Sequence, residues 1–499
     1  MRSYKYYNLS GGIDLNESKT VLGERPKKVF WHDAKNVEIY LNSGLKRMNG
    51  NVEILCLPGG PTITGMFEYS RGNESYLVIN TSDGKFYEYN ESLDELSEKK
   101  SGLHTSAYPS YANFCNGIIC SNGVDEPFFY EKGAATEVSS CNAVDSAGHA
   151  IRGRALTVYR GRVWIGDGGT LYYSGLGQFN NWSKEGDAGY IANFHNDSSK
   201  IVALSCYKEY LAIHKENQTY LLTGSSPDDF AIIPFADRGS VSPQGVRSVE
   251  NSHYFFNNGV YTLEQVGELN QIRLSSEISK RIHPEFLNVD TQRLSEIIIL
   301  PYTKKHQIWL YLPFNTSPYF HTCWIYDYTN DSWFKRVIPQ KVTSACTYKG
   351  NIYIGTADGR IYQEDTGYTF AGIPIDFCWS SPFFTFSEPN RNKTITDLLI
   401  NIDGKNENHF NFHTCKDFAN DDVFDVETVK HVTDTVLIWD EHDWPLEHEK
   451  FCWNIQLEDV EFVTISGSNK SVQLNISGSE VDQDFAIIGF EFRDVVFDD

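Results

Sequence analysis

The 499-residue sequence is poor in methionine and in basic residues, and it has no long apolar run. No stretch reaches the roughly 18 consecutive apolar residues that a transmembrane helix needs, so such a helix is excluded. Its 43 Lys and Arg stand against 66 Asp and Glu, a formal net charge of −23. This balance argues against binding by phosphate neutralisation and against docking on an anionic membrane surface.

Targeting and redox signals are also missing. Residues 1–8 lack the apolar core of a signal peptide. We therefore expect a chain that is made in the cytoplasm and leaves it, if at all, as part of a particle. The ten cysteines include no Cys-x-x-Cys pair, which favours free, mostly buried thiols.

Signatures of catalysis and metal binding are absent as well. The sequence has no Gly-x-Ser-x-Gly, His-Glu-x-x-His or EF-hand pattern. Residues 166–170 are glycine-rich, but no Gly-Lys-Ser/Thr closes them, so a hairpin turn is favoured over a phosphate loop. Residues 440–449 place His442 and His448 among carboxylates, yet Pro445 and the irregular spacing favour a solvated acidic loop. We predict no catalytic, cofactor-binding or metal-binding residues.

Aromatic residues are abundant and lie in short β-type runs between Gly, Asn or Asp turns. The 31 Phe, 29 Tyr and 10 Trp against 3 Met favour strands over helices. In residues 76–89, Asp83 and Gly84 suit the positive φ of a tight hairpin. One apolar residue per unit recurs at gaps of 42, 43, 49, 41, 63 and 37 residues: Phe86, Phe128, Leu171, Tyr220, Tyr261, Trp324 and Ile361. The aromatic stripes themselves are interpreted as core.

A repeat of roughly 40–45 residues with several strands is typical of β-propeller blades. The longest gap contains Ile278 and Ile282 four residues apart, so we expect a short helical insertion near residues 276–297. A stack of β-sandwiches, which also uses short strands with regular turns, is the alternative. We predict an all-β protein whose residues 51–368 form a propeller of six or seven blades.

The two ends of the chain differ from this repeat. After about residue 369, longer alternating strands replace the hairpins, for example at residues 396–403 and 485–492. We predict a separate β-sandwich-like domain of residues 369–499, with an acidic surface region at residues 421–449. Residues 1–50 have mixed character and are expected to form an N-terminal arm with a hairpin.

The N-terminal residues also carry a recognisable pattern. They read Gly11-Gly12-Ile13-Asp14, then Asp33-Ala34-Lys35-Asn36-Val37, then Gly44-Leu45-Lys46-Arg47 with Gly50 after it. This resembles the start of many phage tail and head–tail connector proteins. The last element departs slightly, because Met48 and Asn49 separate Arg47 from Gly50. Further resemblances are Phe179-Asn180-Asn181-Trp182 after the hairpin of residues 164–173, and residues 379–386 with Pro389 and Lys393.

The family that the sequence resembles is the β-propeller tail hub, also called nozzle or stabilisation protein, of short-tailed phages, with the nozzle of gene transfer agents as a relative. The resemblance implies a structural protein of the virion tail, assembled in the host cytoplasm, without enzyme activity or cofactor. It implies a homo-oligomeric ring, expected to be a hexamer, below the portal and adaptor. Such a ring extends the DNA channel, helps to retain packaged DNA and docks tail fibres or spikes.

In that setting, genomic DNA passes through the lumen without sequence-specific binding, and no part inserts into a membrane. An acidic protein suits such a conduit, since like charge prevents phosphate contacts that would hold the genome. A ligand- or glycan-binding propeller module of a tail fibre is an alternative, and a propeller glycosidase is another. Residues 82–85 and 357–360 resemble the Asp turns of sialidases but lack the Thr-Trp that follows there, and no carboxylate pair stands out.

Overall fold

The computed structural model describes residues 2–18, 21–22, 27–182, 187–195, 197–266, 271–403, 408–419, 422–431 and 458–498. The chain divides into two compact units. The larger, which we call the propeller unit, comprises Asn51–Ile325 and Ile338–Thr366. The smaller, which we call the two-sheet unit, comprises Met1–Gly50, Tyr326–Val337 and Gly367–Asp499.

The propeller unit begins with five antiparallel sheets of four strands each. The first contains β6 (Ile63–Arg71), β7 (Glu74–Thr81), β8 (Phe86–Asn90) and β9 (Glu95–Lys100). The next two are β10 (Ser110–Phe114), β11 (Gly117–Ser121), β12 (Phe128–Tyr130) and β13 (Val138–Ser140), then β14 (Ala155–Tyr159), β15 (Arg162–Asp167), β16 (Thr170–Tyr173) and β17 (Gly189–Ile191). The last two are β18 (Ile201–Tyr207), β19 (Tyr210–Lys215), β20 (Thr219–Thr223) and β21 (Ala231–Ala236), then β22 (Val246–Val249), β23 (Ser252–Phe256), β24 (Val260–Val266) and β25 (Gln271–Leu274).

The remaining strands form a sheet in the order β26-β27-β28-β29-β30-β31-β5. These are β26 (Ile298–Tyr302), β27 (Gln307–Tyr311), β28 (Phe320–Asp327), β29 (Ser332–Tyr348), β30 (Asn351–Thr356), β31 (Arg360–Glu364) and β5 (Asn51–Cys56). Strand β29 is 17 residues long, and only its second half, from Val342 to Tyr348, pairs with β30. The sheet therefore contains two four-stranded sets that share β29.

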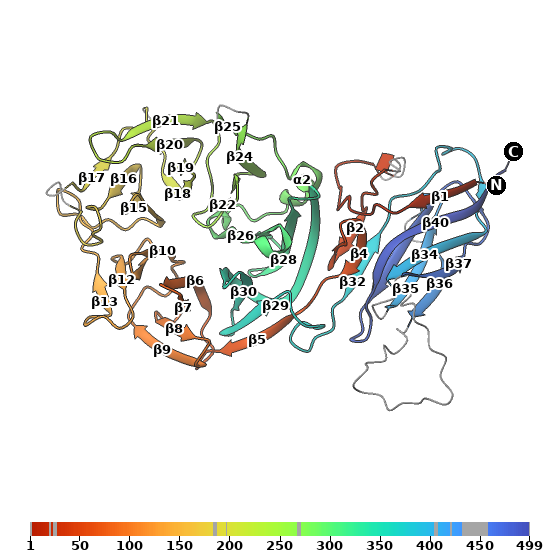
Figure 1. The fold of residues 1–499 in the computed structure, drawn as a ribbon, viewed down its shortest axis with the longest axis horizontal. Helices are drawn as coiled ribbons and strands as arrows, with labels where there is room; N and C mark the ends of the chain where they lie inside the picture. Colours follow the sequence, from red (N-terminus) through yellow and green to blue (C-terminus); the bar gives the residue numbers. More distant parts are fainter. Residues whose placement is uncertain are drawn as a thin grey trace, which may run out of the picture. The chain divides into compact units, whose positions relative to one another are not determined.

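The seven sets follow one another around a common centre (Figure 1). The first strands β6, β10, β14, β18, β22 and β26 each contact the next in this series, and β30 contacts both β26 and β6. The seven marker residues of the sequence repeat all lie on the third strand of their sets, and all are buried: Phe86, Phe128, Leu171, Tyr220, Tyr261, Trp324 and Ile361. The fold is thus a β-propeller, and its described strands make seven blades.

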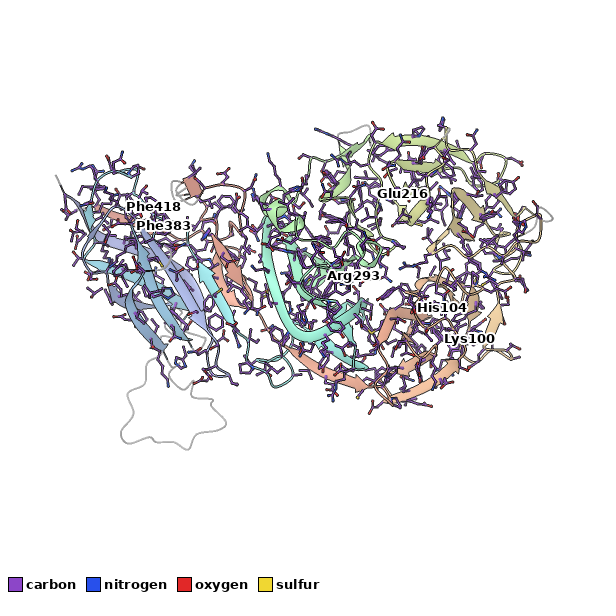
Figure 2. The ribbon with its side chains drawn as sticks, turned by 180° about the vertical axis from the view of Figure 1, so that it is seen from behind. Lys100, His104, Glu216, Arg293, Phe383 and Phe418 are labelled. Carbon is purple, nitrogen blue, oxygen red and sulfur yellow. The ribbon has the colours of Figure 1, made fainter. Side chains whose placement is uncertain are left out.

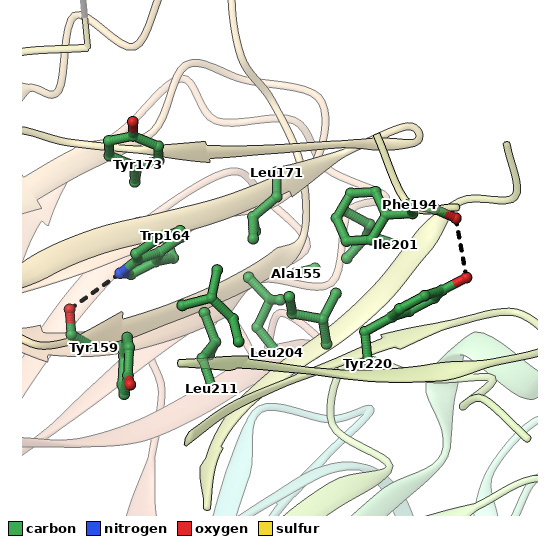
Figure 3. Packing of buried hydrophobic residues seen from close by; sticks show 12 residues of the cluster. Ala155, Tyr159, Trp164, Leu171, Tyr173, Phe194, Ile201, Leu204, Leu211 and Tyr220 are labelled. Atoms are coloured by element: carbon green, nitrogen blue, oxygen red, sulfur yellow. Dashed lines mark hydrogen bonds between the residues drawn. The ribbon is translucent and has the colours of Figure 1, made fainter. Parts of the chain in front are cut away.

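Packing between neighbouring blades buries the aromatic side chains of their strands. Figure 3 shows the cluster between the third and fourth blades, where Trp164 and Leu171 share a core with Leu211 and Tyr220. The polar atoms of these rings are satisfied locally, since Trp164 Nε1 donates to Tyr159 O at 3.0 Å and the Tyr220 hydroxyl to Phe194 O at 3.2 Å. Full burial of each such side chain contributes roughly 1.5–3 kcal/mol, which a single blade with two exposed faces would lose.

Short helices lie in the stretch where the sequence predicts an insertion. They are a 3₁₀ turn at Lys280–Ile282, α2 (His283–Phe286) and a second 3₁₀ turn at Leu294–Glu296. Ile282 and Phe286 are buried, and the Phe286 ring packs against Phe256 with centroids 5.4 Å apart. The insertion thus belongs to the core and accounts for the longest gap in the repeat. Within the described residues, no helix is long and apolar enough to cross a membrane.

The two-sheet unit is built from both ends of the chain. One sheet joins β1 (Arg2–Tyr6), β3 (Val37–Tyr40), β4 (Gly44–Arg47), β33 (Lys393–Thr394), β34 (Asp397–Asp403), β37 (Glu458–Thr464), β38 (Ser468–Asn469) and β40 (Ala486–Phe497). The other has the order β2 (Asp33–Lys35), β32 (Phe377–Ser380), β39 (Val472–Gly478), β35 (Asn408–Lys416) and β36 (Val423–His431). Phe383 and Phe418, labelled in Figure 2, pack in this unit with ring centroids 5.1 Å apart.

This division differs from the predicted one at the N-terminus and at Tyr326–Val337, which the predicted propeller of residues 51–368 included. Residues 1–50 were expected to form a separate arm, but they supply β1, β2, β3 and β4 to the two sheets. The physical reason is backbone pairing, since β1 and β4 both pair with β40 and β2 pairs with β32. The predicted hairpin is present as β3 and β4, with Val37 opposite Arg47. Much of the predicted acidic region at residues 421–449 lies outside the described residues.

Candidate functional site

The glycines of the N-terminal pattern lie where backbones approach closely. Gly11 N donates to Val29 O at 3.0 Å, and a Cβ on Gly11 would lie 2.2 Å from that oxygen. A Cβ on Gly44 would lie 2.3 Å from Ile487 O, and one on Gly50 would lie 1.8 Å from Thr369 O. Only glycine fits at such distances, so the two-sheet unit itself requires these glycines.

The polar residues of the same pattern tie separate chain segments together. Asn36 has a φ of 55°, a conformation that Asn adopts more readily than most residues. Its side chain donates to Asp376 O at 2.8 Å and accepts from Val337 N at 2.8 Å. The buried Arg47 donates to both carboxylate oxygens of Asp484, at 3.1 and 3.3 Å, and to Tyr368 O at 3.0 Å. The polar residues of the pattern therefore form hydrogen bonds between chain segments that are far apart in sequence.

The second part of the resemblance also has a structural role. Trp182 Nε1 lies 3.1 Å from Cys141 O and 2.9 Å from Phe179 O. The Phe179 ring stacks on Phe129 with centroids 4.2 Å apart. Residues 179–182 thus hold the third blade against the second, inside the propeller unit.

The propeller unit contains a cavity at the centre of its blades. Its volume is about 170 Å³, and residues from all seven sets line it, so we call it the central cavity. None of the described lining residues is acidic, and the polar ones are Ser110, Tyr111, Arg154, Gln244, Arg247, Cys346 and Thr347. The cavity is therefore cationic inside a protein of net charge −23. Sequence reasoning missed it, because nothing in the repeat marks which residues face the centre.

Some hydrogen-bond donors of the cavity lining have an acceptor and others have none. Gln244 Nε2 donates to Pro109 O at 3.1 Å, and Thr347 Oγ1 donates to Pro301 O at 3.1 Å. Ser110 Oγ and Arg154 Nε are buried without a hydrogen-bond partner in the described part of the chain. Arg247 donates to its neighbour's carbonyl, Val246 O, at 2.9 Å. Burial lowers the pKa of both guanidinium groups, although arginine stays protonated at neutral pH.

The thiol in the cavity wall is unsuited to nucleophilic chemistry. Burial raises the pKa of Cys346 well above its ordinary value, and a thiolate, not a thiol, is the nucleophile. None of the nine cysteines among the described residues forms a disulfide with another. No group of three or more His, Cys, Asp or Glu in the described ranges could hold a metal ion.

The motifs noted in the sequence that lie within the described residues form turns and core, and none of them lines a site. Residues 166–170 form the turn between β15 and β16, with Asp167 opposite Thr170, as predicted. The aromatic stripes predicted as core are buried at six positions and half-buried at Tyr172; the buried ones are Tyr173, Tyr254, Phe255, Phe256, Trp309 and Trp324. The acidic cluster of residues 440–449, with His442 and His448, lies outside the described residues.

Comparison with known proteins gives a fold likeness only. No protein-family model and no curated protein matches the chain. A chain in the crystal structure of the mitotic checkpoint complex is 12% identical with a TM-score of 0.42, over 62% of this chain and 93% of that chain. The computationally designed Ika8 protein is 11% identical (TM-score 0.39, 63% and 100% covered), and the WD40 β-propeller domain of Doa1 is 12% identical (TM-score 0.40, 63% and 96% covered). With TM-scores below 0.5, these likenesses support no functional conclusion.

Proposed function

We propose that this protein is a structural component of a phage tail, a nozzle or hub ring that continues the channel of the portal and adaptor. The observation that carries the proposal is the placement of the tail-protein pattern. Gly11, Asn36, Gly44, Arg47 and Gly50 each occupy a position where the two-sheet unit demands that residue type. Because these residues are needed for the two-sheet unit, we expect the phage tail proteins with a similar N-terminal pattern to share this architecture.

In this proposal the propeller unit is a rigid wall and the protein performs no catalytic step. The partners are further copies of the chain in a ring, expected to be hexameric, together with the portal–adaptor proteins and the tail fibres or spikes. Genomic DNA passes through the lumen and is helped to stay packaged until ejection. The net charge of −23 supports this role, because like charges repel DNA phosphates.

The first experiment locates the protein in particles. Purified virions are analysed by mass spectrometry and by negative-stain microscopy with an antibody against the propeller unit. We expect several copies per particle and label at the tail axis. Absence of the chain from mature particles contradicts the proposal, and label only at fibre tips favours the glycan-binding alternative.

The second experiment tests assembly of the purified full chain. Native mass spectrometry and negative-stain images are expected to show rings, alone or on added portal–adaptor complex. A monomer that ignores the complex and binds in a glycan array would overturn the assignment. Deletion of residues 1–50 is not a clean test of attachment, because it removes four strands from the two-sheet unit.

A further inference from the structure

The central cavity holds positive charge that the protein leaves without a counter-charge. Arg154 directly precedes β14 and Arg247 lies in β22, so the third and fifth blades each present a guanidinium group to the same cavity. Neither forms a salt bridge in the described part of the chain. The acidic group that acts on Arg154 is Glu296, and its carboxylate is already engaged by Arg293 at 2.6 Å.

An arrangement of this kind is costly when the cavity holds only water. Buried polar groups in native structures almost always have partners, and an exception calls for an explanation. Burial of a guanidinium group also costs free energy, because it disfavours the charged form, and burial lowers the pKa of both arginines. Removing the arginines would relieve the cost, so their presence indicates a ligand that supplies the missing negative charge.

The geometry of the donors indicates the chemistry of that ligand. A guanidinium group offers a planar fork of N–H donors that matches two oxygens of a carboxylate or phosphate. Ser110 Oγ adds a hydroxyl without a partner in the same wall. The rest of the lining mixes apolar side chains such as Leu156 and Leu204 with further polar ones such as Gln244 and Thr347.

The size of the cavity limits the ligand. About 170 Å³ is far more than the roughly 10–15 Å³ that one water needs. It is less than the roughly 300 Å³ at which pockets for drug-sized ligands begin. We propose that Arg154 and Arg247 bind a small free oxyanion in the central cavity, one that carries at least two anionic oxygens, of the phosphate or the dicarboxylate type. The proposal does not depend on the tail assignment.

The test titrates the full chain after exchange into buffer free of phosphate and carboxylates. Inorganic phosphate and succinate are added in separate calorimetric titrations, with sodium chloride at matched ionic strength as the reference. We expect saturable binding of phosphate, succinate or both at one site per chain. The anion that binds with the lower Kd shows whether the site prefers a phosphate or a dicarboxylate. Failure of both to bind beyond the chloride reference overturns the proposal.

Titrations of arginine variants test whether the anion binds at Arg154 and Arg247. Arg154→Met and Arg247→Met are each expected to weaken binding about tenfold or more, since a charge-assisted hydrogen bond is lost. Arg154→Lys and Arg247→Lys keep the charge without the fork, so an intermediate loss is expected. The matched control is Arg152→Met, which removes an exposed arginine two residues from Arg154 and is expected to leave binding unchanged.

A stability measurement separates loss of binding from loss of folding. In anion-free buffer, the double variant R154M/R247M is expected to melt at the same temperature as the wild type or higher, because it lacks the uncompensated charges. Added phosphate or succinate then raises the melting temperature of the wild type but not of the double variant. Equal stabilisation of both proteins contradicts the proposal, and the lysine variants decide the matter if the double variant does not fold.

Discussion

At the scale of single residues, a chain of hydrogen bonds through two buried histidines in the propeller unit is short of a hydrogen. His214 Nε2 and His253 Nε2 lie 2.8 Å apart. On the outer sides, Thr219 Oγ1 lies 2.9 Å from His214 Nδ1 and 2.6 Å from Arg238 O, and Ser248 Oγ lies 2.7 Å from His253 Nδ1 and 2.6 Å from Cys206 O. With both imidazoles neutral, four hydrogens are available for these five contacts.

A fifth hydrogen would place a positive charge in the core. Burial of an ion costs several kcal/mol even after relaxation, whereas one unmade buried hydrogen bond costs about 1–3 kcal/mol. The neutral pair is therefore the more stable state, and one of the five contacts is left without a hydrogen. In agreement, burial lowers the pKa of both imidazoles, that of His253 to about 3.

The lowered pKa values predict stability that is lost in acid. An unfolded histidine titrates near pH 6.5, so between about pH 6.5 and pH 3 the unfolded state binds more protons than the folded state. Stability falls as the pH drops through this window, by roughly 2 kcal/mol per histidine between pH 7.5 and pH 5. Urea unfolding at these two pH values measures the loss in the wild type and in H214Q/H253Q, in which we expect the loss to be smaller by about 4 kcal/mol.

The control for this prediction is His149→Gln, because the His149 side chain is 80% exposed. It is expected to keep the wild-type acid sensitivity. An H214Q/H253Q variant that loses as much stability as the wild type between the two pH values would show that the pair is not the origin.

At the scale of elements, strand β5 connects the beginning of the propeller unit to its last blade. Residues 51–56 precede the first blade in sequence, yet they pair with β31, Asn51 opposite Glu364. The buried Asn51 side chain donates to Glu364 Oε1 at 2.7 Å. This bond joins residues 313 positions apart and fixes the register of the strand.

Asn51→Ala is expected to destabilise the propeller unit by roughly 2 kcal/mol, since a buried carboxylate loses a hydrogen bond. Asn51→Asp adds a second carboxylate beside Glu364, so its cost is expected to be larger at pH 8 than at pH 5. Hydrogen exchange of β31 and β5 amides measures both effects. Asn73→Ala, at an exposed turn, is the control, with an expected change within about 0.5 kcal/mol; an equal loss in both variants contradicts the role of Asn51.

The elements also show what the sequence could and could not predict. The spacing of Phe86 to Ile361 predicted the blades, because each blade buries the same third strand. The turns at Asp83 and Asp358 were visible too, since each Asp precedes a Gly that suits a tight turn; Gly84 and Gly359 have φ angles of 77° and 75°. The pairing of β5 and the placement of Arg154 and Arg247 around one cavity were not visible, because both depend on which distant strands become neighbours.

At the scale of the whole molecule, the two-sheet unit is assembled from three stretches of chain. Tyr6 on β1 packs its ring against Phe384 and Phe490, with centroids 4.6 and 5.3 Å apart. Ala34 on β2 pairs with Trp379 on β32. The C-terminal residues therefore contain only part of their own core.

A fragment of residues 369–499 is accordingly expected not to fold cooperatively, although the sequence suggested an independent domain there. Without β1, β2 and β4, the fragment exposes aromatic rings and unpaired strand edges, which favours aggregation. Urea unfolding followed by circular dichroism, with dye binding to exposed apolar surface, compares the fragment with the full chain. A sharp transition in the isolated fragment would contradict this expectation.

The pairing of β1 with β40 also means that β1 cannot complete its sheet until β40 has been synthesised. Tyr4 lies opposite Phe492, so β1 leaves the ribosome long before β40, the strand with which it pairs. At about 5–20 residues per second, that delay is roughly 25–100 s. During it Tyr4 and Tyr6 have no native neighbour in the sheet, and a chain released before residue 486 would leave β1 without the strand that it pairs with.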